Sequence, residues 1–240
     1  ADFDNDGYPD IFYVNGHLQD NVELFDRTTS YEGHPVLLRN TGQGSFVNVS
    51  DSCGDGMQVK IVGRGVALED LDNDGRIDVV ILSSRRPAVV LKNESPQANH
   101  WVEINLRGAK TNRDGIGARV RVTAGDLSQV DEVHSGRGYQ SHFGTRLHFG
   151  LGKRDRIDRI EVRRIGGGVD VDMAIAVQVL DERHARLLRE ARDQALAAAR
   201  HDDVDVFGHG DELADCGAVG RGDHLHRVLR QAGGGQALLD

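Results

Sequence analysis

The 240-residue sequence has few cysteines and no long apolar run. Its two cysteines, Cys53 and Cys216, lie far apart and form no CxxC pair, which excludes a disulfide-rich scaffold and a structural zinc ribbon. No apolar stretch approaches the roughly 18 residues of a membrane helix, so no membrane span is expected in this piece. The GxSxG, HExxH and P-loop patterns are also absent, and no catalytic motif takes their place.

Acidic residues outnumber basic residues. The chain has 29 Lys and Arg against 38 Asp and Glu, a formal net charge of -9. The basic residues are scattered and are not interleaved with aromatic ones, so a nucleic-acid partner is not expected. Proline is scarce at four residues, whereas 30 glycines indicate many tight turns, which favours a mainly β protein.

Residues 1–97 contain a repeat. "DFDNDGYPD" near the start returns as "DLDNDGRID", with Asp70 sixty-eight positions after Asp2. Each acidic loop is followed by an apolar strand, a polar excursion and a second strand, which reads "VLLRN" at 36–40 and "VVLKN" at 89–93. A period of this length with several strands per unit is typical of a propeller blade or a related β array.

From Trp101 the pattern changes but stays β. "WVEINL", "ARVRVTAG" and "RIEVRR" alternate between apolar and polar residues, which predicts a smaller, sandwich-like β domain at 98–168. Residues 169–240 form an atypical tail. Its leucines and alanines recur at helical spacing and predict one helix at about 181–203, with the remainder disordered.

The acidic loops predict metal sites. Four aspartates stand at positions 1, 3, 5 and 9 around a glycine at position 6: Asp2, Asp4, Asp6 and Asp10 around Gly7, then Asp70, Asp72, Asp74 and Asp78 around Gly75. Ca²⁺ takes six to eight hard oxygen ligands, and the backbone carbonyls of Tyr8 and Arg76 at position 7 would supply one more in each loop. Glycine permits the sharp turn, and Asn5 and Asn73 at position 4 suit a left-handed backbone.

An EF-hand and a metal-free turn are the two other interpretations of these loops. An EF-hand needs a bidentate Glu at position 12 and flanking helices, but Tyr13 and Ile81 stand there, followed by β-forming residues. A metal-free hairpin turn would also use Asp, Asn and Gly. Because four aspartates in register would repel one another without a cation, twice over, the metal interpretation is favoured.

Two further features have competing interpretations. "SGRGYQSHFG" would offer a ligand surface through Arg137, Tyr139, Gln140 and His142, but glycine-dependent turns that close a sandwich account for it better. His134, His142 and His148 fall in three separate segments, and surface histidines are favoured over a metal site.

These motifs resemble known families. "DFDNDGYPDIFYVNG" and "GRGVALEDLDNDGRIDVVILSS" resemble FG-GAP/VCBS repeats, the calcium-loop blades of integrin-α-like β-propellers, and 112–162 resembles an ASPIC/UnbV domain. In this order the two resemble the C-terminal part of the cartilage acidic protein (ASPIC/UnbV) family. The resemblance implies an extracellular or cell-surface location, calcium in the loops through the eight aspartates, and no established enzymatic activity.

The resemblance stops near residue 165. Such domains usually continue into a Trp-Pro-Ser-Gly turn and a final strand, where this chain reads "RRIGGGVDVDM". We therefore interpret the chain as a C-terminal fragment in which 165–240 result from a frameshift or an erroneous gene end. The loss of a final strand would leave an unpaired sheet edge.

The sequence favours a non-catalytic calcium-binding module that presents a surface to an extracellular protein or a glycan. The alternative is an accessory or catalytic part of a secreted polysaccharide-acting enzyme, with Asp131, Glu132 or Asp155 as acid and base. The sequence specifies neither the ligand nor the oligomeric state.

Overall fold

The computed structural model describes residues 1–96, 98–108, 112–163, 173–178 and 206–208. Within these ranges the protein is mainly β, as the sequence predicted. Helical structure there is limited to three 3₁₀ turns: η1 (Val22–Leu24), η2 (Ser50–Ser52) and η3 (Asp55–Gln58). None of these helical segments has the length and hydropathy that a membrane crossing requires.

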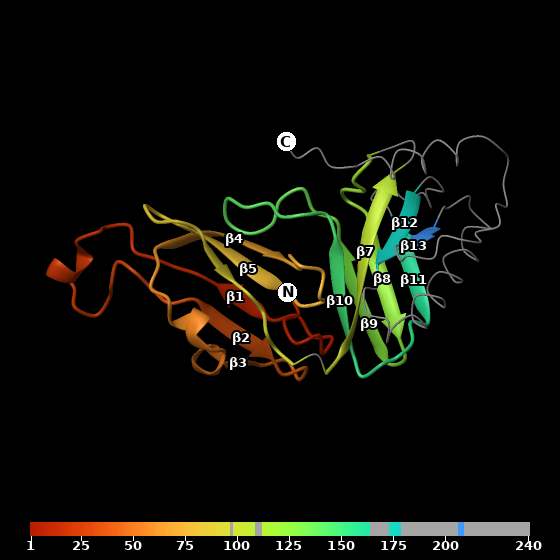
Figure 1. The fold of residues 1–240 in the computed structure, drawn as a ribbon, viewed down its shortest axis with the longest axis horizontal. Helices are drawn as coiled ribbons and strands as arrows, with labels where there is room; N and C mark the ends of the chain where they lie inside the picture. Colours follow the sequence, from red (N-terminus) through yellow and green to blue (C-terminus); the bar gives the residue numbers. More distant parts are fainter. Residues whose placement is uncertain (97, 109–111, 164–172, 179–205, 209–240) are drawn as a thin grey trace, which may run out of the picture. The chain divides into compact units, whose positions relative to one another are not determined.

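The repeat segment forms two three-stranded antiparallel sheets, drawn from red to yellow in Figure 1. The first contains β1 (Ile11–Tyr13), β2 (Val36–Asn40) and β3 (Phe46–Asn48), and the second contains β4 (Gly63–Glu69), β5 (Asp78–Ser83) and β6 (Val89–Leu91). β1 follows the first acidic loop directly, and β5 begins at the last aspartate of the second. The loop-to-strand order inferred from the sequence is therefore confirmed.

Apolar residues from both sheets share one core. Its buried members are Phe3, Ile61, Ile77, Val79 and Ile81, with partly buried residues of β1, β2, β4 and β6 packed against them. Phe3 and Ile77 belong to the acidic loops themselves. Each loop is thus anchored by an apolar side chain inside the core.

The second β segment contains two sheets, drawn from yellow-green through cyan to blue in Figure 1. One sheet has the order β10-β7-β12-β13 and the other β11-β8-β9. Their strands are β7 (His100–Gly108), β8 (Arg119–Ala124), β9 (Leu127–Glu132), β10 (Leu147–Gly152), β11 (Arg159–Arg163), β12 (Met173–Gln178) and β13 (Val206–Gly208).

β12 lies beyond the boundary that the sequence placed at residue 168. It pairs antiparallel with β7 from Met173↔Gly108 to Gln178↔Glu103. The unpaired edge that the sequence led us to expect is therefore filled along β7, because "MAIAVQ" supplies β-forming residues that can continue the sheet. The predicted helix at about 181–203 and the remainder of the tail lie outside the described residues.

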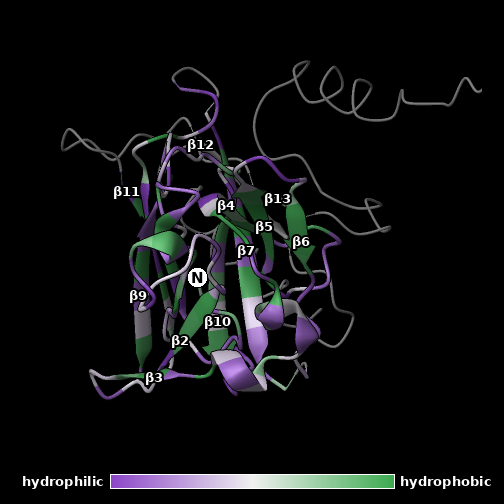
Figure 2. Cartoon of the chain, turned by 90° about the vertical axis from the view of Figure 1, so that its left-hand side faces the viewer, coloured by the Kyte–Doolittle hydropathy of each residue, from purple (hydrophilic) through white to green (hydrophobic). Residues whose placement is uncertain are grey.

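The core of the second segment is built by strict alternation. Val102, Ile104 and Leu106 of β7 point to the same face as Leu147 and Phe149 of β10, and all are buried. β8 contributes the facing layer. Figure 2 shows the same separation: strands such as β5, β6 and β10 are largely hydrophobic, whereas the turns between strands are hydrophilic.

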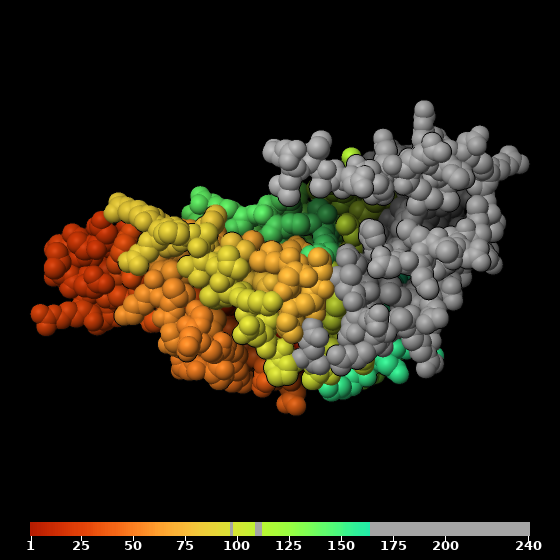
Figure 3. Space-filling model, viewed as in Figure 1, coloured from red at the N-terminus to blue at the C-terminus, as the bar shows by residue number. Residues whose placement is uncertain are grey.

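The polar excursion between β1 and β2 exposes large apolar side chains. Leu18 is 89% exposed, and Leu24 and Phe25, at the 3₁₀ turn η1, are each 79% exposed. This part of the chain, red in the space-filling view, lies at the left margin of Figure 3. It contributes to neither of the two cores.

Candidate functional site

The two acidic loops share the backbone conformation that the sequence predicted. Asn5 and Asn73 at position 4 have φ of 57° and 58°, in the left-handed region. Gly7 and Gly75 at position 6 have φ of 98° and 84°, which L side chains rarely adopt. Both loops therefore curl in the same way around their aspartates.

The aspartate at position 1 organises each loop through backbone amides. The carboxylate of Asp2 accepts bonds from the Asp6 amide at 3.1 Å and the Gly7 amide at 2.8 Å. Asp70 does the same with the Asp74 amide at 3.0 Å and the Gly75 amide at 2.6 Å. Each carboxylate is thus fixed at the centre of its loop.

The aspartate at position 9 joins its loop to the neighbouring strand. Asp10 accepts from the amide of Asn40, at the end of β2, at 2.8 Å. Asp78 accepts from the amide of Asn93, just after β6, at the same distance. The side chains explain the repeated asparagine of "VLLRN" and "VVLKN": Asn40 Oδ1 accepts from the Gly42 amide and Asn93 Oδ1 from the Ser95 amide, each at 3.0 Å, so each asparagine closes the turn after its strand.

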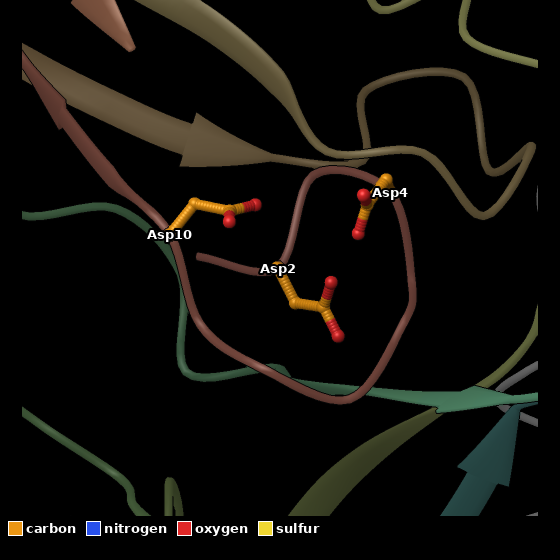
Figure 4. A group of neighbouring side chains, drawn as sticks. All are labelled: Asp2, Asp4 and Asp10. Carbon is orange, nitrogen blue, oxygen red and sulfur yellow. The ribbon is translucent and has the colours of Figure 1, made fainter. Parts of the chain in front are cut away.

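Three carboxylates converge in each loop. Ligand atoms of Asp2, Asp4 and Asp10 all lie within 4.8 Å of one another, and Asp70, Asp72 and Asp78 form the equivalent group. Figure 4 shows the three side chains of the first group directed into the loop. That separation is about twice a Ca²⁺–oxygen distance of roughly 2.4 Å, so one calcium ion between the three carboxylates fits this donor set.

The aspartates at position 5 lie outside these two groups. Asp6 accepts from the Tyr8 amide at 2.8 Å. Asp74 accepts from the Arg76 amide at 3.0 Å and forms an ion pair with the guanidinium of Arg76. The structure therefore brings together three of the four predicted carboxylates in each loop. The carbonyl ligands assigned to Tyr8 and Arg76 stay predictions.

The first loop buries negative charge. Asp2 is 5% exposed and Asp10 is 7% exposed. Burial raises the pKa of Asp2 to about 7, and burial likewise raises the pKa of Asp10. Carboxylates in such surroundings favour protonation unless a cation compensates them, which is the environment expected of a metal site.

The second loop has cations of its own. Lys92 Nζ lies 2.5 Å from Asp72 Oδ2, and this hydrogen bond lowers the pKa of Asp72. Arg76 pairs with Asp74. Asp70 is buried at 1% exposure, and that burial raises its pKa. Asp70 in the second loop is therefore desolvated, as Asp2 is in the first. Lys92 and Arg76 partly neutralise Asp72 and Asp74 of the second loop.

Four residues of the second β segment lie against the loops: Trp101, Glu103, Arg146 and His148. The interpretation of His148 as a surface histidine is wrong, because its side chain is 9% exposed and its Nε2 lies 2.6 Å from Asn5 Oδ1. Arg146 Nη2 donates to the Asp70 carbonyl at 2.6 Å. A signal for this burial was present in "WVEINL", where a large Trp stands on the face opposite Val102 and Ile104.

The glycine-rich segment "SGRGYQSHFG", which the sequence offered as a ligand surface or a turn, is mainly a turn. Gly138 has φ of 71°, and the Arg137 amide bonds to the Ser141 carbonyl at 3.1 Å, which agrees with the turn interpretation. Tyr139 is exposed and Gln140 has φ of 47°. Of the four predicted ligand residues, Arg137 lines a cleft of about 570 Å³, and Tyr139, Gln140 and His142 are not among its lining residues.

That cleft lies between the first acidic loop and β9. Tyr8, Glu69, Gln129, Asp131, Arg137 and Phe143 are among its lining residues. Arg137 Nη2 donates to the Glu132 carbonyl at 3.0 Å, and its guanidinium carbon lies 5.8 Å from the centre of the Phe143 ring. The first acidic loop thus borders the cleft on one side, and the ion pair between Arg137 and Asp131 borders it on the other.

The carboxylates named for the enzymatic alternative do not converge. Asp131 and Glu132 are neighbours on β9, so their side chains point to opposite faces of the sheet. Glu132 is paired with Arg119 at 2.8 Å, whereas Asp131 lines the cleft. Asp155 lies in the loop between β10 and β11 and does not line the cleft.

Comparison with protein families agrees with this architecture. Residues 2–81 match the family model for an FG-GAP-like repeat, and residues 108–167 match the model for ASPIC and UnbV. The chain therefore combines an FG-GAP-like repeat segment with an ASPIC/UnbV domain, and the resemblance drawn from the sequence is confirmed.

Among individual proteins, the chain is a distant relative of cartilage acidic protein 1. It is 27% identical to the Mus musculus and Homo sapiens proteins over 170 residues and 26% identical to the Xenopus tropicalis protein over 167 residues. Each alignment covers 68% of this chain. The chain spans about a quarter of the length of these relatives, 24%, 23% and 24% respectively.

Proposed function

We propose that this chain is a non-catalytic, calcium-binding module of an extracellular or cell-surface protein. The observation that carries the proposal is the duplicated loop, in which three carboxylates converge within 4.8 Å at two equivalent places. Asp2, Asp10, Asp70 and Asp78 are buried there, and a divalent cation would offset the cost of keeping them ionised.

The ion would act as a structural staple. Each loop leads directly into a strand and contains no helix pair that could swing open, so calcium is expected to order the loop without a large change of shape. Extracellular calcium modules bind with dissociation constants of about 10⁻⁴–10⁻³ M. At such affinities the loops would be occupied constitutively outside the cell.

The proposed partner is an extracellular protein or a glycan. The exposed apolar side chains of Leu18, Leu24 and Phe25 favour a protein contact on the excursion after β1. The cleft bordered by Tyr8 and Arg137 offers a second, more polar surface. The family relationship to cartilage acidic protein 1 supports an extracellular setting.

The test is calcium binding measured together with thermal stability. Millimolar Ca²⁺ should raise the melting temperature, and isothermal titration should give two sites per chain. Asp72→Ala should remove one site, whereas Asp26→Ala is the matched control, because Asp26 is an exposed aspartate that bonds only to Thr28 in the described structure. A melting curve that does not respond to calcium in the wild-type protein would rule the proposal out.

A further inference from the structure

The outer face of the β7–β10 pair is buried although it lies opposite the sandwich core. On β7, Val102 and Ile104 point into the core, while Trp101 and Glu103 point to the other face, where they are 3% and 1% exposed. A sheet face away from its core is ordinarily solvated. Here the two acidic loops cover it.

The second acidic loop is held on this face by Arg146. Its Nη2 donates to the Asp70 carbonyl at 2.6 Å and its Nη1 to Asn73 Oδ1 at 2.7 Å. The same guanidinium pairs with Glu103 at 2.8 Å, which keeps it oriented. Next to it, the indole of Trp101 packs so closely on Gly75 that a Cβ there would overlap the ring.

The first acidic loop is held by the neighbouring strand, β10. His148 Nε2 lies 2.6 Å from Asn5 Oδ1, and the Gly152 amide donates to the Asn5 carbonyl at 2.8 Å. Gly150 leaves no room for a side chain, since its missing Cβ would overlap the carboxylate of Asp2 and lie 2.6 Å from the Asn5 Cα.

The two loops also touch each other. Asn5 Nδ2 donates to the Gly75 carbonyl at 2.8 Å, in a buried contact. The imidazole of His148 stacks on the Trp101 ring with centroids 5.7 Å apart and planes 12° from parallel. The contacts therefore close a ring, from Asn5 to Gly75, Trp101, His148 and back to Asn5.

This ring passes through the residues that give the loops their conformation. Asn5 occupies position 4 of the first loop and Gly75 position 6 of the second, and both have positive φ. A cation that orders one loop must fix these residues. The cost of ordering the partner loop then falls, because its contact across the ring is already in place.

We propose that the sheet face of the ASPIC/UnbV domain couples the two loops, so that calcium binding in one raises the calcium affinity of the other. Asn5 and His148 are the positioning residues of this coupling. The inference rests on the proposed function, since it requires that both loops bind calcium. It predicts cooperative binding from a module whose strands do not rearrange.

Trp101 provides a direct readout for the second loop. It is the single tryptophan of the sequence and lies against Gly75, so it can sensitise the luminescence of Tb³⁺ bound in that loop. Competition with Ca²⁺ then gives the affinity of the second loop. An Asp72→Ala variant identifies any signal that comes from the first loop.

The decisive comparison is wild type against a protein with a disabled first loop. Asp4→Ala should weaken cation binding in the second loop about fivefold or more, although Asp4 is not one of its ligands. Reciprocity requires Asp72→Ala to weaken the first loop by the same factor, as measured by titration calorimetry. Asp4→Asn serves if the alanine variant is poorly folded.

The positioning residues have their own variants. Asn5→Gly keeps the positive φ but removes the amide, and should abolish the coupling while both loops still bind. His148→Ala should reduce the coupling, and His148→Gln should restore much of it, because a glutamine amide can donate to Asn5 Oδ1. Asn73→Gly is the matched control: it removes one bond to Arg146 but keeps the Arg146 bond to the Asp70 carbonyl and the Asn5 contact with Gly75, so the coupling should survive.

The outcomes separate the two proposals. No heat and no Tb³⁺ luminescence in the wild-type protein would refute calcium binding itself. Two occupied loops, with the second unaffected by Asp4→Ala, would leave the proposed function intact and overturn the coupling. Coupling that persists in Asn5→Gly would overturn the role of Asn5.

Discussion

The loops at 2–10 and 70–78 share one sequence pattern, one set of backbone torsions and one arrangement of amide-to-carboxylate bonds. They differ in what surrounds them. The second loop has Lys92 on Asp72, Arg76 on Asp74 and Arg146 on its backbone. The first loop places Asp2 at a pKa of about 7 with no cation of that kind directly on it.

The same loop motif therefore occurs in two different electrostatic surroundings. In the second loop, side-chain cations already offset part of the repulsion between aspartates, so the loop can hold its shape without metal. In the first loop Asp2 is held by the backbone amides of Asp6 and Gly7 and its burial raises its pKa, so an added cation has more to stabilise. We therefore expect the first loop to contribute more of the calcium-dependent stability than the second.

The largest effect is expected from removing Arg146, which would make the second loop resemble the first. Arg146→Met leaves Glu103 buried without its arginine, and this should lower the free energy of unfolding by about 3–5 kcal/mol. Urea unfolding in the absence of metal measures the loss. Added calcium should then stabilise this variant more than it stabilises wild type.

A double substitution checks the cause. Arg146→Met combined with Glu103→Leu should recover part of the lost stability, because the fully buried Glu103 carboxylate is no longer left without its arginine, while Glu69, the other partner of Arg146, is 24% exposed and stays partly solvated. The matched surface change, Arg159→Met, removes an exposed pair with Glu161 and should cost less than about 1 kcal/mol. Equal losses for Arg146→Met and Arg159→Met would show that the buried network is not what holds the second loop.

The next effect concerns the two glycines at position 6. Gly75→Ala should cost about 3 kcal/mol or more, since it adds backbone strain at φ of 84° and an overlap with the Trp101 ring. Gly7→Ala should cost about 2 kcal/mol, because the atom it meets, Leu127 Cδ2 at 2.7 Å, is the end of a flexible side chain.

Gly44→Ala is the matched control for strain alone. Gly44 has φ of 78° and nothing within 4 Å of its missing Cβ, so the change should cost only about 1 kcal/mol. All three are compared by urea unfolding without metal. If Gly44→Ala costs as much as Gly75→Ala, then backbone strain accounts for the whole effect and the packing of Trp101 on the loop contributes nothing.

A structural feature could be predicted from the sequence when the residues that determine it lie close together in the chain. The torsions of Asn5 and Gly7 and the strand after each loop follow from contacts within a few residues, and the sequence predicted them. The terminal asparagines of "VLLRN" and "VVLKN" were noticed as a repeat, but their bond to position 9 became clear only in the fold.

The contacts on the outer face of the β7–β10 pair could not be predicted from the sequence. His148 meets Asn5 across 143 positions and Arg146 meets the Asp70 carbonyl across 76, and no local pattern encodes such contacts. The strand pattern itself places Glu103 and Trp101 on the face that would be solvent-exposed if the sandwich stood alone. Their burial is set by what packs on that face, and only the three-dimensional arrangement supplies it.

The pH response should separate the loops further. Because the folded pKa of Asp2 is raised to about 7 from 3.8, its contribution to the stability of the metal-free protein is complete below about 3.8 and is lost as pH rises through 7. Calcium needs the ionised form, so calcium affinity of the first loop should fall about fivefold from pH 7 to pH 6. Asp72, whose pKa is lowered, imposes no such competition on the second loop.

Calcium titration at pH 6, 7 and 8 measures this in the two single-loop variants. With the second loop disabled by Asp72→Ala, the affinity that remains should depend steeply on pH. With the first disabled by Asp4→Ala, the dependence should be shallower, since the hydrogen bond from Lys92 lowers the pKa of Asp72 in that loop, while burial raises the pKa of Asp70. Parallel pH profiles for the two variants would contradict the electrostatic difference.

The smallest effect is expected at Lys92, the cation that occupies a ligand carboxylate of the second loop. Both side chains of this pair are about half exposed, at 51% for Lys92 and 44% for Asp72, so water screens the ion pair and it contributes little to stability. Lys92→Met should therefore lower the stability of the metal-free protein slightly and strengthen calcium binding in the second loop by about two- to fivefold. The control is Arg85→Met, which removes a more exposed pair with Asp20 outside the two loops and should leave calcium affinity unchanged. Weaker calcium binding in Lys92→Met would mean that the lysine holds Asp72 in place for the ion and does not compete with it, and the two loops would then differ in geometry more than in charge.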